Sequence, residues 1–222
     1  DGPGEAIAAD DAALRMLFGR PYVEETLMGL RYQVSPAAFF QVNTAAAEQL
    51  CALLRTQCGV GPQTTLLDVC CGTGAIGLSM AGAVRAVWGI EMCAAAVDDA
   101  RRNAQRNGVT NAHFVAGKAE ERIERVLQCL KEEDRQHLVA VVDPPRAGLH
   151  DSVLKALRGC LPLRRILYVS CHAPSFVKNA VALCRPPSNT FRGRPFELRH
   201  AFPVDLFPHT EHCELVVLLE RA

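Results

Sequence analysis

The sequence lacks several features that would mark a special class of protein. Its first residues, 1–5, include no initiator methionine, no basic segment and no apolar segment, so we expect no signal peptide. No apolar run approaches the length of a membrane span, so we expect no membrane contact. There is no internal repeat and no low-complexity tract. With 222 residues, 49% hydrophobic and 22% charged, the chain has the composition of one globular domain. Because it lacks an initiator methionine, we expect it to be a domain cut from a longer protein.

Cysteine is abundant, but the 10 cysteines form no C-x-x-C pair, and the adjacent Cys70 and Cys71 suit neither a disulfide framework nor a zinc site. We therefore expect a reduced, intracellular protein located in the cytoplasm, with the nucleus and the mitochondrion left open. A cluster near the C-terminus also lacks the spacing of a metal site, so we predict no bound metal; its members are His209, Glu211, His212 and Cys213.

The chain carries no net charge, because 24 Lys and Arg balance 24 Asp and Glu. The balance is uneven along the sequence, since residues 144–200 contain ten basic residues and only two acidic ones. Two interpretations are open: the solvated faces of ordinary helices, or a basic surface for a polyanion.

Residues 65–77 hold the most informative stretch, a short apolar run that breaks at glycines and continues as a helix-like pattern. Gly72, Gly74 and Gly77 fit G-x-G-x-x-G, which suits several nucleotide and nucleoside cofactors. Glycines between a strand and a helix let backbone N–H groups approach a ligand, because no Cβ stands in the way. We predict that this turn binds a cofactor, with Cys70 and Ala75 beside the first two glycines.

Apolar runs and helical patterns alternate from this stretch to the end of the chain. The predicted strands are residues 65–69, 86–90, 113–116, 138–142, 166–169, 196–201 and 214–219, and the predicted helices are residues 44–58, 76–81, 94–107, 119–134, 152–158 and 176–183. This alternation indicates an α/β fold with a doubly wound, mostly parallel sheet of these seven strands. Polar residues just past the strand ends then converge on one edge of the sheet, namely Gly72, Gly74, Glu91, Asp143, Arg146 and Cys171.

Two acidic residues favour S-adenosylmethionine as the cofactor. Glu91 follows the second predicted strand of this series, where a carboxylate accepts hydrogen bonds from ribose hydroxyls. Asp68 lies at the end of the first strand, where it would repel a pyrophosphate but attract the cationic sulfonium and amino groups of S-adenosylmethionine. We therefore prefer this cofactor to a nicotinamide dinucleotide.

Five short motifs occur in an order that resembles the RNA uridine C5-methyltransferases, and most closely the eukaryotic tRNA (uracil-5-)-methyltransferases. They are Phe39–Asn43, Asp68–Gly74, Asp143–Gly148, Ser170-Cys171 and His212–Glu214. The resemblance covers about residues 33–222. It implies a Rossmann-like, class I S-adenosylmethionine-dependent methyltransferase that modifies the T-loop uridine of tRNA, acting as a monomer with an RNA-binding domain further upstream. Two positions depart from the usual pattern, Cys70 in place of a glycine or an aromatic, and His172-Ala173-Pro174 in place of Asn-Pro.

The domain boundary follows from the same pattern. We assign residues 35–222 to the methyltransferase catalytic domain. Residues 1–34 begin acidic and irregular and then alternate, so we interpret them as a linker and the last strands of a preceding domain that is absent here.

The chemistry of uracil methylation gives the candidate residues their roles. Carbon 5 of uracil becomes nucleophilic only after a thiolate adds to carbon 6, and a base must later remove the carbon 5 proton. We predict Cys171 as the nucleophile, Glu214 as the base, and Arg146 as a cation that favours the thiolate. The resemblance implies that Gln41 and Glu91 contact the cofactor, that Asp143 contacts the cofactor or the base, and that Phe39 stacks on the flipped uracil.

Other functions remain open at this point. A methyltransferase for exocyclic amines would want an aromatic where Arg146 stands, and an RNA cytosine C5-methyltransferase would want a second cysteine in the Pro144-Pro145 loop. An RNA-binding or RNA-folding module that keeps this fold, or a methyltransferase that acts on rRNA or mRNA uridines, stays as an alternative.

Overall fold

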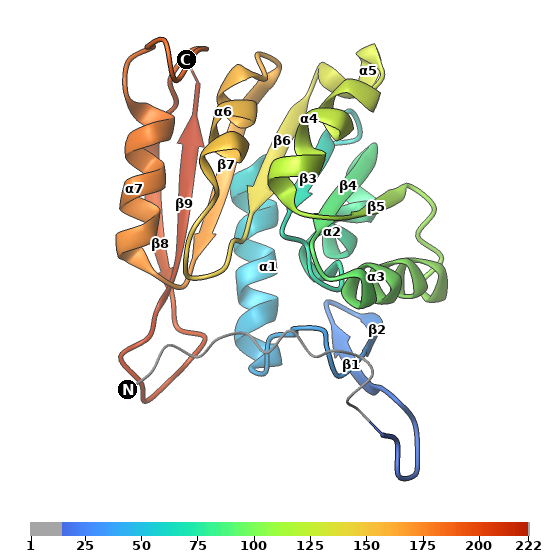
Figure 1. Cartoon of the computed structure of the whole chain (residues 1–222). Coiled ribbons are helices and arrows are strands. Elements are labelled where there is room, and N and C mark those ends of the chain that lie inside the picture. Colours follow the sequence, from blue (N-terminus) through green and yellow to red (C-terminus); the bar gives the residue numbers. More distant parts are fainter. Residues whose placement is uncertain (1–14, 222) are drawn as a thin grey trace.

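The computed structural model describes residues 15–221 as a central sheet with helices on both faces and a small hairpin at one end (Figure 1). The predicted linker in residues 1–14 lies outside the described residues. No helix within the described part of the chain is long and apolar enough to cross a membrane.

The strands are β1 (Val23–Leu27), β2 (Leu30–Val34), β3 (Thr65–Val69), β4 (Ala86–Glu91), β5 (Ala112–Ala116), β6 (Leu138–Val142), β7 (Leu163–Ser170), β8 (Glu197–Val204) and β9 (Glu214–Glu220). The helices are α1 (Thr44–Cys58), α2 (Ala75–Met80), the short 3₁₀ helix η2 (Ala81–Ala83), α3 (Ala94–Arg106), α4 (Ala119–Cys129), α5 (Glu132–Arg135), α6 (Asp151–Gly159) and α7 (Ala173–Cys184).

The seven-stranded sheet has the order β5-β4-β3-β6-β7-β9-β8, in which β9 pairs antiparallel with both β7 and β8 and all other pairs are parallel. The predicted doubly wound, mostly parallel α/β sheet is therefore confirmed. The direction of winding reverses between β3 and β6, and ligands bind at such a switch point, outside the carboxyl ends of the strands.

The two faces of the sheet carry different helices (Figure 1). Alternate residues of β3 show this division, because Leu67 and Val69 pack with α4, α6 and α7, whereas Leu66 packs with α1. Both β3 and β6 are buried along their whole length, as expected for central parallel strands.

The helix boundaries differ from the predicted ones by more than one residue in two places. The predicted helix 119–134 is two helices, because Leu130 adopts an extended conformation between them. The predicted helix 176–183 begins earlier, at Ala173, because Pro174 is compatible with the first turn of a helix. At α1 the predicted cap is confirmed, since the Asn43 side chain accepts a hydrogen bond from the backbone N–H of Ala46 at 3.2 Å.

The hairpin of β1 and β2 packs against the side of the sheet domain that carries α1 and α3. Tyr32 of the hairpin is fully buried, and the Gln33 N–H donates to Oδ1 of Asn103 at 2.7 Å. Ser35 adds to the contact with α3, because its N–H and its hydroxyl both donate to the carboxylate of Asp99. The hairpin therefore shares a core with the residues that follow it, while its assignment to a preceding domain stays a prediction.

Candidate active site

The predicted site residues lie at the carboxyl edge of the parallel strands. The glycine turn follows β3, Glu91 ends β4, Asp143 follows β6 and Cys171 follows β7. The strands β3, β4 and β6 end at the same height in the sheet, since Val69 pairs with both Ile90 and Val142. The N–H of Asp143 extends this pairing by donating to the carbonyl oxygen of Val69 at 3.1 Å. The convergence expected from topology is therefore present.

The glycine turn owes its shape to left-handed backbone conformations. Cys70, Gly72 and Gly74 have φ angles of 65°, 54° and 80°. A Cβ on Gly74 would lie 3.0 Å from Cζ of Phe114, so this position needs glycine for space as well as for conformation. Cys70 holds a conformation that costs a non-glycine residue about 1–2 kcal/mol. The turn thus accepts a side chain at Cys70 but not at Gly74.

Asp68 is fully buried beneath this turn. Its Oδ2 accepts a hydrogen bond from the Gly77 N–H at 2.9 Å, while Oδ1 has no partner among the described residues. Burial raises the pKa of Asp68 to about 7, and the nearby carboxylates of Asp143 and Glu91 add to that rise. A cation near Oδ1 would give this oxygen a partner and would also stabilise the ionised carboxylate.

Glu91 supports the turn directly. Its Oε2 accepts a hydrogen bond from the Gly72 N–H at 3.0 Å, and its Oε1 accepts one from the Cys93 N–H at 2.8 Å. Each oxygen of a carboxylate has a second acceptor position, so ribose hydroxyls can still bind there. The structure thus gives Glu91 a supporting contact that the sequence did not predict.

The loop with Phe39 and Gln41 lies beside the glycine turn, because a Cβ on Gly72 would lie 3.9 Å from the Phe39 carbonyl oxygen. The Phe39 side chain is 68% exposed, and Gln41 is half-buried. Phe40 instead packs on Tyr32, with ring centroids 5.4 Å apart. Of the two aromatic rings, Phe39 is therefore the one available to a ligand.

Cys171 lies across from Glu214 at the end of two antiparallel strands. Ser170 pairs with Leu215, so the next step in register places Cys171 opposite Glu214. Cys171 is half-buried and free, and Glu214 is only 3% exposed. The predicted nucleophile and the predicted base are therefore neighbours, although they are 43 positions apart in the sequence.

The charges around Cys171 favour the thiol over the thiolate. Burial raises the pKa of Cys171, the carboxylates of Glu214 and Asp143 raise it further, and Arg146 lowers it. The sequence predicted a thiolate-favouring environment from Arg146, but this exposed cation only partly offsets the carboxylates and the burial.

The carboxyl groups of Asp143 and Glu214 also have pKa values raised into the neutral range. Burial raises the pKa of Asp143 to about 7, with a contribution from Glu91. Burial, followed by the charge of Asp143, raises the pKa of Glu214 to about 8. Oε1 of Glu214 has no hydrogen-bond partner within residues 15–221. A carboxyl group with such a pKa can exchange protons at physiological pH, as a general base must.

Several residues near the site were not singled out by the sequence. Ser175 and Asn179 of α7 bind the loop that carries Asp143 and Arg146 through hydrogen bonds to Arg146 and Leu149. Serine and asparagine in a helix carry no signal that predicts such contacts. Only the position of the helix after Cys171 could have suggested them.

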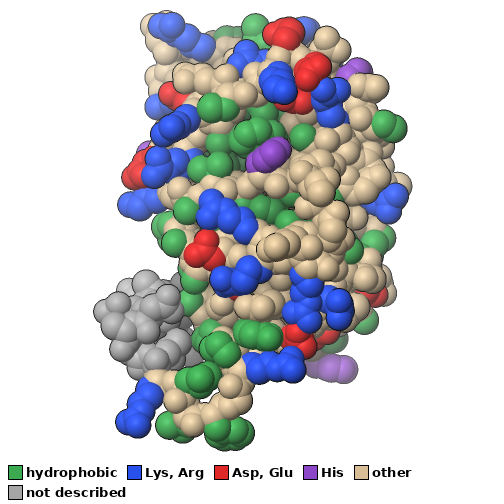
Figure 2. Space-filling view, turned by 90° about the vertical axis from the view of Figure 1, so that its right-hand side faces the viewer, with side chains coloured by type: hydrophobic (Ala, Val, Ile, Leu, Met, Phe, Trp, Pro, Cys, Tyr) green, Lys and Arg blue, Asp and Glu red, His purple; other side chains and the backbone are tan. Residues whose placement is uncertain are grey.

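The basic excess of residues 144–200 is partly internal. Arg158 is fully buried and donates to four carbonyl oxygens, while Arg165 and Arg199 are paired with Glu220. On the side of the molecule that carries α3 and β5, Lys and Arg side chains are interspersed with Asp and Glu (Figure 2). The internal pairing lowers the number of basic side chains that remain for one large surface, and the mixed charges of Figure 2 belong to a side away from residues 144–200.

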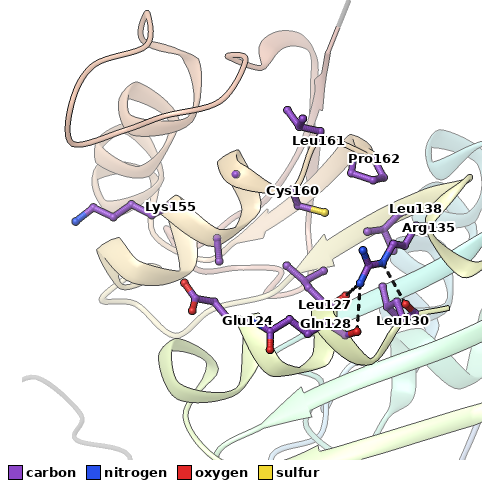
Figure 3. A pocket seen from close by; sticks show the side chains of 12 residues that line it. Glu124, Leu127, Gln128, Leu130, Arg135, Leu138, Lys155, Cys160, Leu161 and Pro162 are labelled. Carbon is purple, nitrogen blue, oxygen red and sulfur yellow. Dashed lines mark hydrogen bonds between the residues drawn. The ribbon is translucent and has the colours of Figure 1, made fainter. Parts of the chain in front are cut away.

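One cavity lies away from these residues. It has a volume of about 460 Å³ and lies between α4 and α6, with Leu127, Cys160 and Leu161 in its wall (Figure 3). Leu138, which begins β6, also lines it, so it is at the amino edge of the strands. No predicted site residue borders it. Within residues 15–221, no cluster of three or more His, Cys, Asp and Glu side chains could hold a metal ion.

Comparison with known proteins gives a consistent result. The family model for tRNA (Uracil-5-)-methyltransferase matches residues 6–222. The chain is 49% identical to tRNA (uracil-5-)-methyltransferase homolog B of Mus musculus over 211 residues, which is 93% of this chain and 42% of that protein. It is 45% identical to homolog A of Homo sapiens over 221 residues, which is 100% of this chain and 35% of that protein.

A solved structure is also similar, that of Pyrococcus abyssi tRNA (uracil-54, C5)-methyltransferase in complex with S-adenosyl-L-homocysteine. The TM-score is 0.72 and the identity 29%, over 91% of this chain and 45% of that one. The chain therefore spans less than half the length of each of these relatives.

Proposed function

Because the chain belongs to the tRNA (uracil-5-)-methyltransferase family, we propose that it transfers a methyl group from S-adenosylmethionine to carbon 5 of a uridine in tRNA. We propose the T-loop uridine as the target, since the similar archaeal enzyme is named for uracil 54. The observation that carries this proposal is the pairing of Cys171 with Glu214, next to Asp143, at the edge of the sheet that holds the glycine turn.

The residues around the turn fit the proposed cofactor. Gly72 and Gly74 leave room for a close approach to the backbone, and Glu91 has acceptor positions for ribose hydroxyls. The unpartnered Oδ1 of Asp68 and the half-buried carboxyl of Asp143 favour a cationic ligand. When bound, S-adenosylmethionine supplies an electrophilic methyl group on a positively charged sulfur.

In the proposed mechanism, Cys171 and Glu214 act in sequence on one uracil. The thiol of Cys171 loses its proton to water, and Sγ then bonds to carbon 6 as the C5=C6 π bond breaks, so that the resulting enolate makes carbon 5 nucleophilic. Carbon 5 would then take the methyl group as the methyl–sulfur bond of the cofactor breaks. Glu214 then removes the proton from carbon 5, and the electrons of that C–H bond restore the ring double bond as the C6–Sγ bond breaks. The exposed Phe39 ring offers a surface on which the flipped base stacks.

The first experiment tests the covalent step. The complete protein is mixed with S-adenosylmethionine and tRNA that contains 5-fluorouridine, whose fluorine replaces the proton that Glu214 must remove. The adduct cannot resolve, so a protein–RNA band should appear on a denaturing gel. The band should disappear in Cys171→Ala. A band that persists in this variant would exclude Cys171 as the nucleophile.

The second experiment tests the base with ordinary tRNA. Glu214→Gln should methylate once and then release its product slowly, so a methylated adduct accumulates. Glu211→Gln, which changes an exposed carboxylate three residues earlier, is the matched control and should turn over normally. If Glu214→Gln also turned over normally, the base would be another group. Binding of tRNA with neither adduct nor methylation in the unmodified protein would favour the RNA-folding alternative.

Further properties of the whole protein remain proposals. Residues 35–222 form the proposed catalytic domain, and the relatives' greater length leaves room for an RNA-binding domain elsewhere. We propose a monomer that acts on tRNA in the cytoplasm.

A further inference from the structure

One face of α7 forms hydrogen bonds to the loop that joins β6 to α6. Ser175 and Asn179 are four residues apart in the helix and therefore share this face. Oδ1 of Asn179 accepts hydrogen bonds from the Leu149 N–H and the Tyr168 hydroxyl, both at 2.7 Å, and its Nδ2 donates to the Leu149 carbonyl oxygen at 3.2 Å. Asn179 thus joins the end of the loop to β7, the strand that leads to Cys171.

Ser175 makes the second connection. Its hydroxyl donates to the carbonyl oxygen of Arg146 at 2.6 Å and lies 2.7 Å from Nδ1 of His172. A hydroxyl has one proton, and the carbonyl can only accept, so the imidazole must donate its Nδ1 proton to Ser175. The residue that follows Cys171 is therefore linked through Ser175 to the backbone of Arg146.

The loop lies so close to α7 that only glycine fits at the contact. Gly148 has a φ of 79°, and a Cβ there would lie 2.7 Å from Oδ1 of Asn179 and 3.4 Å from Cβ of Ser175. A buried amide, a bridging hydroxyl and this close approach together hold the loop against the helix. Asn179 is itself only 7% exposed, which makes its hydrogen bonds hard to replace with water.

From this geometry we propose that Ser175 and Asn179 are positioning residues, which hold Arg146 and Asp143 in register with Cys171. The expected effect on methylation rests on the proposed function, whereas the expected effect on the pKa of Cys171 does not. Burial raises the pKa of Cys171, Glu214 of β9 and Asp143 raise it further, and Arg146 lowers it. His172 is the adjacent titratable group. If Ser175 holds Arg146 near the thiol, loss of its hydroxyl must weaken the effect by which Arg146 lowers the pKa of Cys171.

The direct test needs no RNA. Alkylation of Cys171 by iodoacetamide is followed over a range of pH by peptide mass spectrometry, which separates it from the other cysteines. In Ser175→Ala the midpoint should move to higher pH, as in Arg146→Ala, and the double variant should show little further change. Ser175→Thr keeps a hydroxyl and should restore the midpoint. Ser152→Ala is the matched control, because Ser152 makes a similar contact of 2.9 Å to His150 at the start of α6.

The catalytic test measures methylation of tRNA by the complete protein. Misplacement of a catalytic group by about 1 Å can cost 10²-fold in rate, so we expect kcat of Ser175→Ala to fall by about 10- to 100-fold. The KM for S-adenosylmethionine should rise much less than kcat falls, because the glycine turn and Glu91 are untouched and only Asp143 lies on the displaced loop. Asn179→Ala should act in the same direction, and its folding is checked by circular dichroism.

The outcomes separate the two proposals. An unchanged alkylation midpoint in Ser175→Ala, or a Ser175→Thr variant as impaired as Ser175→Ala, would overturn the positioning role. If the unmodified protein methylated no RNA, the proposed function would fail, while the alkylation profile would still decide whether Ser175 positions Arg146.

Discussion

Glu214 allows a quantitative prediction about stability and pH. The pKa of this buried carboxyl is about 8 in the folded protein, against an ordinary value of 4.5. Between these two values the folded state holds a proton that the unfolded state has lost. Stability from this group is therefore complete below pH 4.5 and is lost as the pH rises through 8.

The size of the effect follows from the proton count. One proton bound only in the folded state changes the free energy of unfolding by about 1.4 kcal/mol per pH unit. In Glu214→Gln this residue no longer binds a proton in the folded state that it loses on unfolding. The free energy of unfolding of the unmodified protein should thus fall more steeply with pH, by up to about 1.4 kcal/mol per unit between about pH 5.5 and 7. Asp68 and Asp143, whose pKa values are raised to about 7, leave a remaining slope of the same sign in the variant.

The assay is urea denaturation at half-unit pH intervals, with the free energy extrapolated to water. Glu211→Gln is the control, because this carboxylate is exposed and should leave the slope unchanged. Equal slopes in Glu214→Gln and the unmodified protein would mean that Glu214 is ionised in the folded state at neutral pH. The argument that burial equips Glu214 as a base near pH 7 would then fail.

Three further substitutions test the turn and the core. Gly74→Ala should destabilise the protein by about 1–2 kcal/mol from its positive φ alone, measured by urea denaturation, and weaken cofactor binding, measured by calorimetry. Glu91→Gln keeps one carbonyl oxygen for two N–H donors, those of Gly72 and Cys93, and should raise the Kd for S-adenosylmethionine about tenfold in the same calorimetric assay. Arg158→Met removes four hydrogen bonds to carbonyl oxygens and should cost about 3 kcal/mol or more in urea denaturation, with kcat of the folded protein unchanged.

The sheet and the strand ends were predictable because they depend on local patterns. An apolar run between turn residues predicts a buried strand, and alternation with helices predicts parallel pairing. The positions of Asp68, Glu91, Asp143 and Cys171 at one edge follow from that topology without any knowledge of contacts.

The contacts across this edge depend on register, which the sequence does not display. Cys171 meets Glu214 only because β9 inserts antiparallel beside β7, and no local signal specifies that alignment. The left-handed conformation of Cys70 was equally hidden, since glycine is the residue that usually predicts it. The hydrogen bonds from α7 to the loop between β6 and α6 could not be predicted from the sequence, because Ser175 and Asn179 resemble any polar residues of a surface helix.

The buried carboxyl groups connect cofactor binding to stability. Asp68 and Asp143 lie on neighbouring strands and share the influence of Glu91, so each resists ionisation beside the others. A cationic ligand reverses this cost, because it stabilises the same charges that destabilise the folded chain by itself. Since such a ligand binds the folded state alone, its affinity and the stability that it adds must both rise as the pH passes through 7. If Asp68 and Asp143 face the cofactor as proposed, the burial that weakens the protein in alkaline solution also makes the site selective for a positively charged cofactor.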